Sequence, residues 1–257
     1  MAGHIGVLGR MIPLLWADPA QVKAPTRYEV QTAPARRWAF VSTPASARRR
    51  EWSLEMSGTQ REMSPVLQLA AGYLGDGPFW LVTEEAALCN VLTPGMSMLE
   101  GVANAGPVDT VDGMSATSVV GGAQVLLARR VPVIPGQPVT VSVDASGDTV
   151  LSVQCVDAAG GAVGAAYTGR ASGTRMQRIR VLIADVPAGV AAINVRAAGY
   201  VSLACPQVVW SEEPAPWDIG QGSDSVIVEE STMTHTVFEP GMRDWWRGLS
   251  LTLKEVG

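Results

Sequence analysis

Histidine, cysteine and lysine are scarce in this sequence, which limits the chemistry that the chain can carry. Its 257 residues include two histidines and three cysteines, and its only lysines are Lys23 and Lys254. A zinc site needs several His or Cys side chains at suitable spacing, and no such cluster is present. The odd number of cysteines, without a C-x-x-C pair, predicts buried thiols in a reducing compartment instead of a disulfide framework. A bridge between Cys155 and Cys205 stays open if their strands are neighbours.

Long apolar runs and an excess of positive charge are also missing. No stretch reaches the roughly 20 apolar residues of a membrane span. The apolar N-terminus is interrupted by Arg10 and Pro13 and lacks the features of a signal peptide. The net charge of −5, from 19 basic and 24 acidic residues, offers no counter-charge for nucleic acid. We therefore expect a protein made and kept in a cytoplasm, with neither a membrane nor a specific nucleic acid as partner.

Aromatic residues are nearly absent from the middle of the chain. Between residues 90 and 209 the only ones are Tyr167 and Tyr200, whereas tryptophans gather in the first 80 residues and from Trp210 onward. Two cores built from different side chains predict two domains. We place the first part of a split β domain at 1–90, an inserted domain at 91–213, and the closing strands of the split domain at 214–257.

Alternating apolar and polar residues predict half-buried strands in the split domain. The alternation is present at 28–31, 38–40 and 51–56, and it returns over 249–253 at the end of the chain. We expect the last of these strands to pair with strands from the first 60 residues.

The period changes to that of a helix over PVLQLAAGY, where Val66, Leu69 and Tyr73 share one stripe. Ser64 would be the N-cap of this helix, with Pro65 at its first position. Gly72 and Gly75 would end it.

The same stretch contains a G-D-G at 75–77. A phosphate-binding glycine loop leaves a strand and opens a helix, so that backbone N–H groups face the phosphate. This G-D-G instead follows a helix and precedes the strand-like PFWLVT. We expect a turn that delivers Phe79 and Trp80 into a core, and no cofactor.

The middle of the chain is predicted to be an antiparallel sandwich or jelly roll. Short strands with turn residues between them, and no helical pattern, are typical of that fold. We expect two strands, 139–143 and 151–155, joined by a turn at Gly147 and Asp148, and three more between 176 and 210.

Three segments resemble minor tail proteins of the distal-tail type from long-tailed phages of actinobacterial hosts. They are GYLGDGPFWLVTEEAALCNVLTPGMS, ACPQVVWSEEPAPWDIGQG and SLTLKEVG. The resemblance implies a β-rich ring subunit, commonly hexameric, that joins the tail tube to the tip. It also implies an inserted galactose-binding or carbohydrate-binding-module jelly roll. The implied partners are further copies of the chain, the tail tube protein, the tip or baseplate hub protein and the tape measure protein, in the virion tail tip.

Candidate site residues serve binding and assembly and not catalysis. His4 lies near a terminus that we expect to be mobile, His235 is isolated on a strand, and neither has the context of a catalytic triad. Sugar contact would fall to Tyr167 and Arg170, with Asp157. Under the ring hypothesis, contacts between subunits would involve the following residues: Trp245, Trp246, Arg48, Arg49 and Arg50.

Two other functions stay open. The chain could be a carbohydrate-binding module for host cell-wall glycan, or a glycan hydrolase, which needs only two carboxylates that meet in space. A structural ion at Asp109 and Asp112 is also conceivable. We expect no enzymatic activity.

Overall fold

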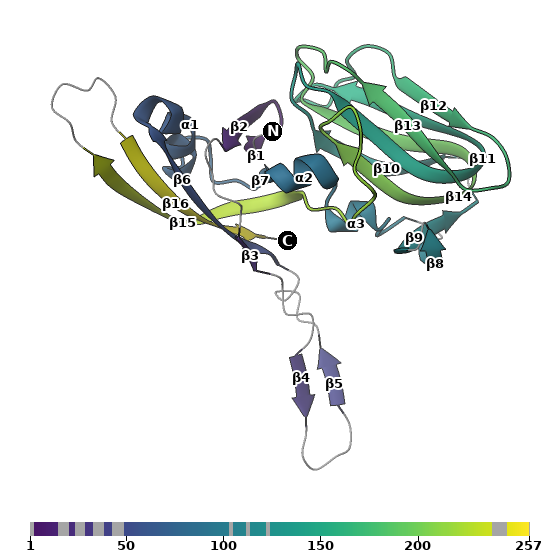
Figure 1. The fold of residues 1–257 in the computed structure, drawn as a ribbon, viewed down its shortest axis with the longest axis horizontal. Helices are drawn as coiled ribbons and strands as arrows, with labels where there is room; N and C mark the ends of the chain where they lie inside the picture. The colour runs from purple at the N-terminus through teal and green to yellow at the C-terminus, as the bar shows by residue number, and fades with distance from the viewer. Residues whose placement is uncertain are drawn as a thin grey trace. The chain divides into compact units, whose positions relative to one another are not determined.

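The computed structural model describes residues 3–14, 21–23, 29–32, 39–42, 49–102, 105–111, 114–121, 124–237 and 246–256. Strands in antiparallel sheets dominate it (Figure 1), so the predicted mainly β fold class is confirmed. The chain divides into a large unit, Met1–Pro13 with Trp80–Asp224, and a small unit, Leu14–Phe79 with Ser225–Gly257. The domain boundaries predicted at 90 and 213 stay a prediction.

The small unit is a sheet built from segments near both ends of the chain. Its neighbouring strands are β15 (Ser223–Val237), β16 (Trp246–Glu255), β6 (Glu51–Thr59) and β3 (Gln21–Lys23), in that order. Strand β16 runs antiparallel to β6, with Leu251 opposite Leu54. The predicted pairing of the last strand with the first 60 residues is therefore confirmed. One face of this pair is buried and carries Trp52, Leu54, Met56, Leu249, Leu251 and Leu253.

Two further strands predicted in the first part of the chain form a hairpin. Strand β4 (Glu29–Thr32) pairs with β5 (Ala39–Ser42), with Val30 opposite Val41. Tyr28 and Trp38, which belong to the predicted strands, lie outside the described residues.

Helix α1 (Gln60–Ala70) begins before the predicted start. Thr59 is its N-cap: the hydroxyl of Thr59 accepts the Glu62 backbone N–H, and the Glu62 carboxylate accepts the Thr59 backbone N–H. This reciprocal capping box satisfies free donors of the first turn. Ser64 therefore lies inside the helix, and its predicted role as N-cap is wrong. Tyr73 follows the helix and is 80% exposed, so its predicted place in the buried stripe is also wrong. The buried residues are Met63, Val66 and Leu69.

The G-D-G segment is a turn. Gly72, Gly75 and Gly77 have positive φ angles, which favour glycine, and strand β7 (Phe79–Val82) follows. Phe79 and Trp80 are buried, as predicted. In the large unit, β1 (Gly3–Val7) pairs with β7, and β2 (Arg10–Leu14) lies beside β1.

Two strands of 18 residues run through the large unit. They are β11 (Val139–Val156) and β14 (Ala192–Val209), and they pair with each other in antiparallel orientation. The first half of β11 also pairs with β13 (Gln177–Ile183), and its second half pairs with β12 (Tyr167–Ala171). The first half of β14 pairs with β10 (Gln124–Pro132). Its second half pairs with β9 (Met114–Val120), which pairs with β8 (Ala105–Val111).

Both halves share one core, which makes the large unit sandwich-like. Inward side chains of the first half, such as Val141 and Val181, and of the second half, such as Val153 and Val195, belong to one buried cluster. Gly169 of β12 lies close to the backbone and side chains of β13, where a larger residue would clash.

The predicted turn at Gly147 and Asp148 is wrong, because the chain continues as β11. Gly147 (φ 93°) and Gly199 (φ 73°) lie at irregular positions of the β11–β14 ladder. Glycine at such positions allows a bulge and a bend without reversing the chain. Gly199 likewise allows β14 to continue without reversing, so the region 176–210 holds two strands, β13 and β14, and not the predicted three.

No disulfide joins any two of the three cysteines, all of which lie in the described residues. Cys155 lies opposite Ile193, whereas Cys205 follows Ala204, which lies opposite Asp144 farther along the ladder. The two strands are neighbours, but this register separates Cys155 from Cys205 and excludes the bridge that the sequence left open.

Candidate functional site

The outward face of the first half of β11 carries a row of buried polar side chains. Burying a polar group costs free energy unless it finds a hydrogen-bond partner. Residues after β14 supply part of the cover: the Thr140 hydroxyl donates to the carbonyl oxygens of Ser211, at 2.6 Å, and Glu212. The members of the row are at most 5% exposed: Thr140, Ser142, Asp144 and Ser146.

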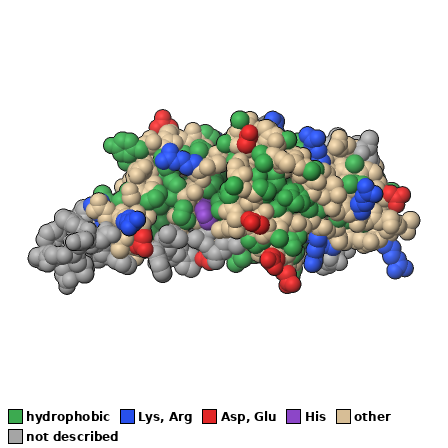
Figure 2. Space-filling model, turned by 90° about the horizontal axis from the view of Figure 1, so that it is seen from above, with side chains coloured by type: hydrophobic (Ala, Val, Ile, Leu, Met, Phe, Trp, Pro, Cys, Tyr) green, Lys and Arg blue, Asp and Glu red, His purple; other side chains and the backbone are tan. Residues whose placement is uncertain are grey.

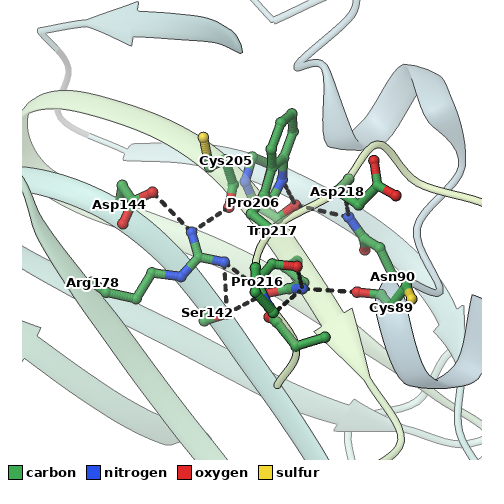
Figure 3. A network of polar contacts seen from close by, with 12 residues as sticks. Cys89, Asn90, Ser142, Asp144, Arg178, Cys205, Pro206, Pro216, Trp217 and Asp218 are labelled. Atoms are coloured by element: carbon green, nitrogen blue, oxygen red, sulfur yellow. Dashed lines mark hydrogen bonds and ion pairs between the residues drawn. The ribbon is translucent and has the colours of Figure 1, made fainter. Parts of the chain in front are cut away.

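Arg178 of β13 satisfies most of the remaining groups (Figure 3). Its Nη1 donates to Asp144 Oδ2 at 2.9 Å and to the carbonyl oxygen of Cys205 at 2.8 Å. Its Nη2 donates to Ser142 Oγ at 3.0 Å and to Gln207 Oε1 at 2.7 Å. Arginine suits this position because its planar group presents several donors in a fixed geometry. One side chain therefore joins β13, β11 and β14.

Two amides extend this network to the segments before and after the sandwich. Gln207 Nε2 donates to the carbonyl oxygens of Cys89, at 2.8 Å, and Ala215, at 3.1 Å. Asn90 Nδ2 donates to the carbonyl of Asp218 at 2.9 Å, and Asn90 Oδ1 accepts the Val208 backbone N–H at 3.2 Å. Both side chains are at most 1% exposed. We call Asn90, Ser142, Asp144, Arg178, Gln207 and Trp217 the junction network; Trp217 joins it by donating from Nε1 to the Pro206 carbonyl.

Backbone hydrogen bonds hold the same two segments together. The Val91 N–H donates to the Val208 carbonyl at 2.7 Å, and the Gly222 N–H donates to the Leu92 carbonyl at 3.0 Å. Gly220 and Gly222 lie so close to the carbonyls of residues 91–93 that an added Cβ would overlap them. Helix α2 (Glu84–Cys89) precedes residues 91–93 in the chain, and helix α3 (Pro94–Ser97) follows them. A threonine hydroxyl caps each helix. The incoming and outgoing ends of the sandwich are therefore fastened to each other.

The junction network is built to position the chain. Ser142 Oγ is bonded to Arg178 and Gln207, and neither is a general base for a serine nucleophile. Within the described ranges, no group of three His, Cys, Asp or Glu side chains is arranged to hold a metal ion. Desolvation raises the pKa of the Cys89 thiol, with smaller contributions from Glu85 and Asp218, and burial raises that of Cys155. Raised thiol pKa values mean less of the reactive thiolate near neutral pH.

The histidines lie in different settings. His4 is 6% exposed on β1, and its ring packs edge-on against Trp210 with the centroids 5.3 Å apart. The expectation of a mobile His4 is therefore wrong, because β1 is paired with β7. His235 lies on β15 opposite Arg247.

The predicted sugar contacts do not share one face. On β12, Tyr167 packs against the buried core, whereas Arg170 is exposed on the opposite face of the strand. Asp157 lies in a turn, where its carboxylate accepts the Gly161 N–H at 2.8 Å. Tyr200 is buried, as expected. Sugar contact by Tyr167, Arg170 and Asp157 stays a prediction.

The predicted subunit-contact residues are only partly described. Arg50 donates from Nη2 to Glu255 Oε1 at 2.8 Å, and its guanidinium lies 4.9 Å from the centroid of the Trp52 ring. Arg49 is exposed, and Trp246 begins β16. Arg48 and Trp245 lie outside the described residues, as does Asp112 of the suggested ion site. Arg50 therefore joins the last strand to β6 within one chain, whatever its role between chains.

The junction network is not predicted by any local pattern in the sequence. Val alternates with Thr or Ser in 139–143, and Arg178 and Arg180 alternate with Ile179 and Val181, but these two local patterns do not relate Arg178 to the first strand. The available signal was Asp144 in the same alternating row, since a buried acid needs a basic partner.

Comparisons with known proteins give little similarity. No family model matches the sequence, and no curated protein does. Among solved structures, the enzymatically active domain of bacteriophage CBA120 tailspike protein 4 aligns with 14% identity and a TM-score of 0.37. The alignment covers 47% of this chain and 21% of the tailspike chain, so this protein spans about a fifth of that length. No helix in the described parts of the chain is long and apolar enough to cross a membrane.

Proposed function

We propose that this protein is a structural subunit of a phage tail tip, a distal-tail-like ring component that joins the tail tube to the tip. In this role it assembles with copies of itself, with six as the expected number. It contacts the tube protein on one side and the hub protein on the other, with the tape measure protein nearby. Its sandwich-like large unit is available for contact with host glycan. The role is one of assembly without catalysis.

The junction carries this proposal. Two of the segments that resemble distal-tail-like proteins, around Asn90 and around Gln207, are far apart in the sequence. Asn90 Oδ1 nevertheless accepts the N–H of Val208, 118 positions away. The third segment, SLTLKEVG, lies in β16 and its end, and β16 pairs with β6. These contacts are the ones expected if a sandwich is inserted into a split sheet, and they support the proposal.

Strand β15 supports assembly with other chains. The side chains of residues 229–234 are all exposed. Successive side chains of a strand point to opposite faces, so this part of β15 is exposed on both faces. Met233 in this stretch is 45% exposed. Figure 2 shows hydrophobic side chains reaching the surface between polar ones on the face that it presents. Exposed strands and apolar side chains favour association, which closed rings use.

Light scattering after size exclusion tests the proposal on purified protein. We expect a mass several times the 27.0 kDa of one chain, and closed rings in negative-stain micrographs. Mass spectrometry of purified virions should find the protein among the tail components. A strict monomer at tens of micromolar, together with its absence from virions, would overturn the proposal.

A charge reversal tests the predicted contact residues. The pair Arg48→Glu and Arg49→Glu should weaken the assembly, because acidic groups of a neighbour would then be repelled. Arg61→Glu, which reverses the charge of an exposed arginine on α1, is the control and should leave the assembled mass unchanged.

The purified protein also serves to test the two alternative functions, a carbohydrate-binding module and a glycan hydrolase. An independent carbohydrate-binding module would bind cell-wall glycan as a monomer and be absent from virions. A glycan hydrolase would release reducing ends from cell-wall polysaccharide, and we expect no such release.

A further inference from the structure

The second half of the sandwich presents a sheet face with a distinct composition. Its strands lie in the order β12, β11, β14 and β10. Leu151, Val153 and Cys155 point into the core, so the alternate residues of β11 point outward. Cross-strand register places outward residues of the other strands beside them. One row is Arg170, Val150, Ala198 and Gln124; the next is Thr168, Ser152, Arg196 and Leu126.

A third row continues this outward face. Gln154 lies opposite Asn194, and Arg129 follows the inward Ala128, which lies opposite Val195. We call these three rows the arginine face. Arg129, Arg170 and Arg196 are all exposed. Adjacent strands lie about 4.8 Å apart and residues rise about 3.3 Å along a strand, so the backbone of Arg196 lies on the order of 10 Å from those of Arg129 and Arg170, which are on the order of 20 Å from each other.

Only one sign of charge is present on the arginine face. Its three rows contain three arginines and no aspartate or glutamate, although acidic residues outnumber basic ones in the whole chain. None of the three arginines forms an ion pair with any residue in the described parts of the chain. Asp148 and Asp157 lie beyond the two ends of the rows. This face therefore has uncompensated positive charge.

The other polar side chains can serve hydroxyl groups. Ser152 and Thr168 have hydroxyls, and Gln124, Gln154 and Asn194 have amides, which both donate and accept hydrogen bonds. Asn194 uses its oxygen for the Arg130 N–H at 2.8 Å, and its amide nitrogen has no partner among the described residues. A surface rich in amides and hydroxyls, with separated guanidinium groups, matches a polymer that carries both hydroxyls and anionic substituents.

We propose that the arginine face binds an anionic polysaccharide, whose carboxylate or phosphate substituents pair with Arg129, Arg170 and Arg196. Guanidinium groups bind both kinds of anion in bidentate geometry. Nucleic acid fits less well, because no aromatic side chain lies in the three rows to stack on bases. This inference rests on the proposed function only in that glycan contact belongs to the large unit, and it names the place and the class of glycan.

Isothermal titration with defined polymers tests the proposal. The probes are polygalacturonate for carboxylate, phosphomannan for phosphate, neutral dextran and single-stranded DNA. We expect at least one anionic glycan to bind, with affinity that falls as salt rises, and no binding of dextran. Equal or tighter binding of DNA would overturn the assignment to a polysaccharide, and binding of dextran would overturn the role of charge.

Matched double variants locate the binding site. Arg170→Ala with Arg196→Ala should weaken binding at least tenfold, because charged hydrogen bonds are lost. Arg175→Ala with Arg180→Ala removes the same charge from exposed positions outside the arginine face and should change affinity less than twofold. Equal losses in the two variants would overturn the proposed location. Assembly, measured separately by light scattering, shows whether the ring proposal fails independently of glycan binding.

Discussion

At the scale of single residues, Arg178 is the centre of the junction network. Its side chain is 21% exposed and that of Asp144 only 7%. Replacing Arg178 by methionine leaves the Asp144 carboxylate buried without its cation, and breaking a buried pair in this way costs about 3 kcal/mol or more. We expect the free energy of unfolding, measured in urea, to fall by that amount in Arg178→Met.

Neighbouring variants make this prediction specific. Arg180→Met changes an exposed arginine on the same strand and should cost less than about 0.5 kcal/mol. Adding Asp144→Leu to Arg178→Met removes the buried charge that has lost its arginine and should restore part of the lost stability. If Arg178→Met and Arg180→Met were equally stable, the network would contribute no stability.

Sequence reasoning at this scale succeeds for residues whose surroundings are local. The turn that buries Phe79 and Trp80 could be predicted because its glycines and the following strand are adjacent. Arg178 could not, because its partners come from β11 and β14, and the pairing depends on a cross-strand register that no local pattern contains. Burial of the polar face of β11 likewise depends on residues 211–217, which return over it.

At the scale of elements, the strands were predicted more reliably than their ends. Alternation indicated both halves of β11, but Gly147 was interpreted as a reversal of the chain. Glycine permits both outcomes, and the choice depends on whether partner strands pair on both sides of it. Here β14 pairs with β11 on both sides of Gly147, so the strand continues. Helix α1 likewise begins earlier than predicted, because Thr59 and not Ser64 is its N-cap.

The start of α1 can be tested by comparing those two caps. Thr59→Ala removes the hydroxyl that accepts the Glu62 N–H and should lower the free energy of unfolding by about 1 kcal/mol. Ser64→Ala, at the position predicted from the sequence, should cost less than half as much, because Ser64 lies within the helix. Thermal unfolding of the two variants measures the difference. A larger loss in Ser64→Ala would contradict the capping box.

At the scale of the whole molecule, the sequence predicted a split sheet closed by its last strand, and β16 beside β6 confirms it. That prediction succeeded because tryptophan and leucine mark both ends of the chain while the middle lacks aromatics. The division into units has an energetic consequence. The buried cluster that includes Val153 contains only residues of the large unit, while Leu251 lies in the sheet of the small unit.

Cavity variants in the two units should therefore destabilise different parts of the chain. Leu251→Ala should cost about 2–5 kcal/mol, because the side chain is fully buried between Leu249 and Leu253 on β16. Local unfolding then becomes easier where the lost contacts were, so hydrogen exchange should accelerate in β6 and β16 while β11 and β14 stay protected. Val153→Ala should give the reverse pattern. Uniform acceleration in both variants would mean that the chain unfolds as one cooperative body. Separate patterns would mean that the large unit keeps its structure when the sheet of the small unit opens locally.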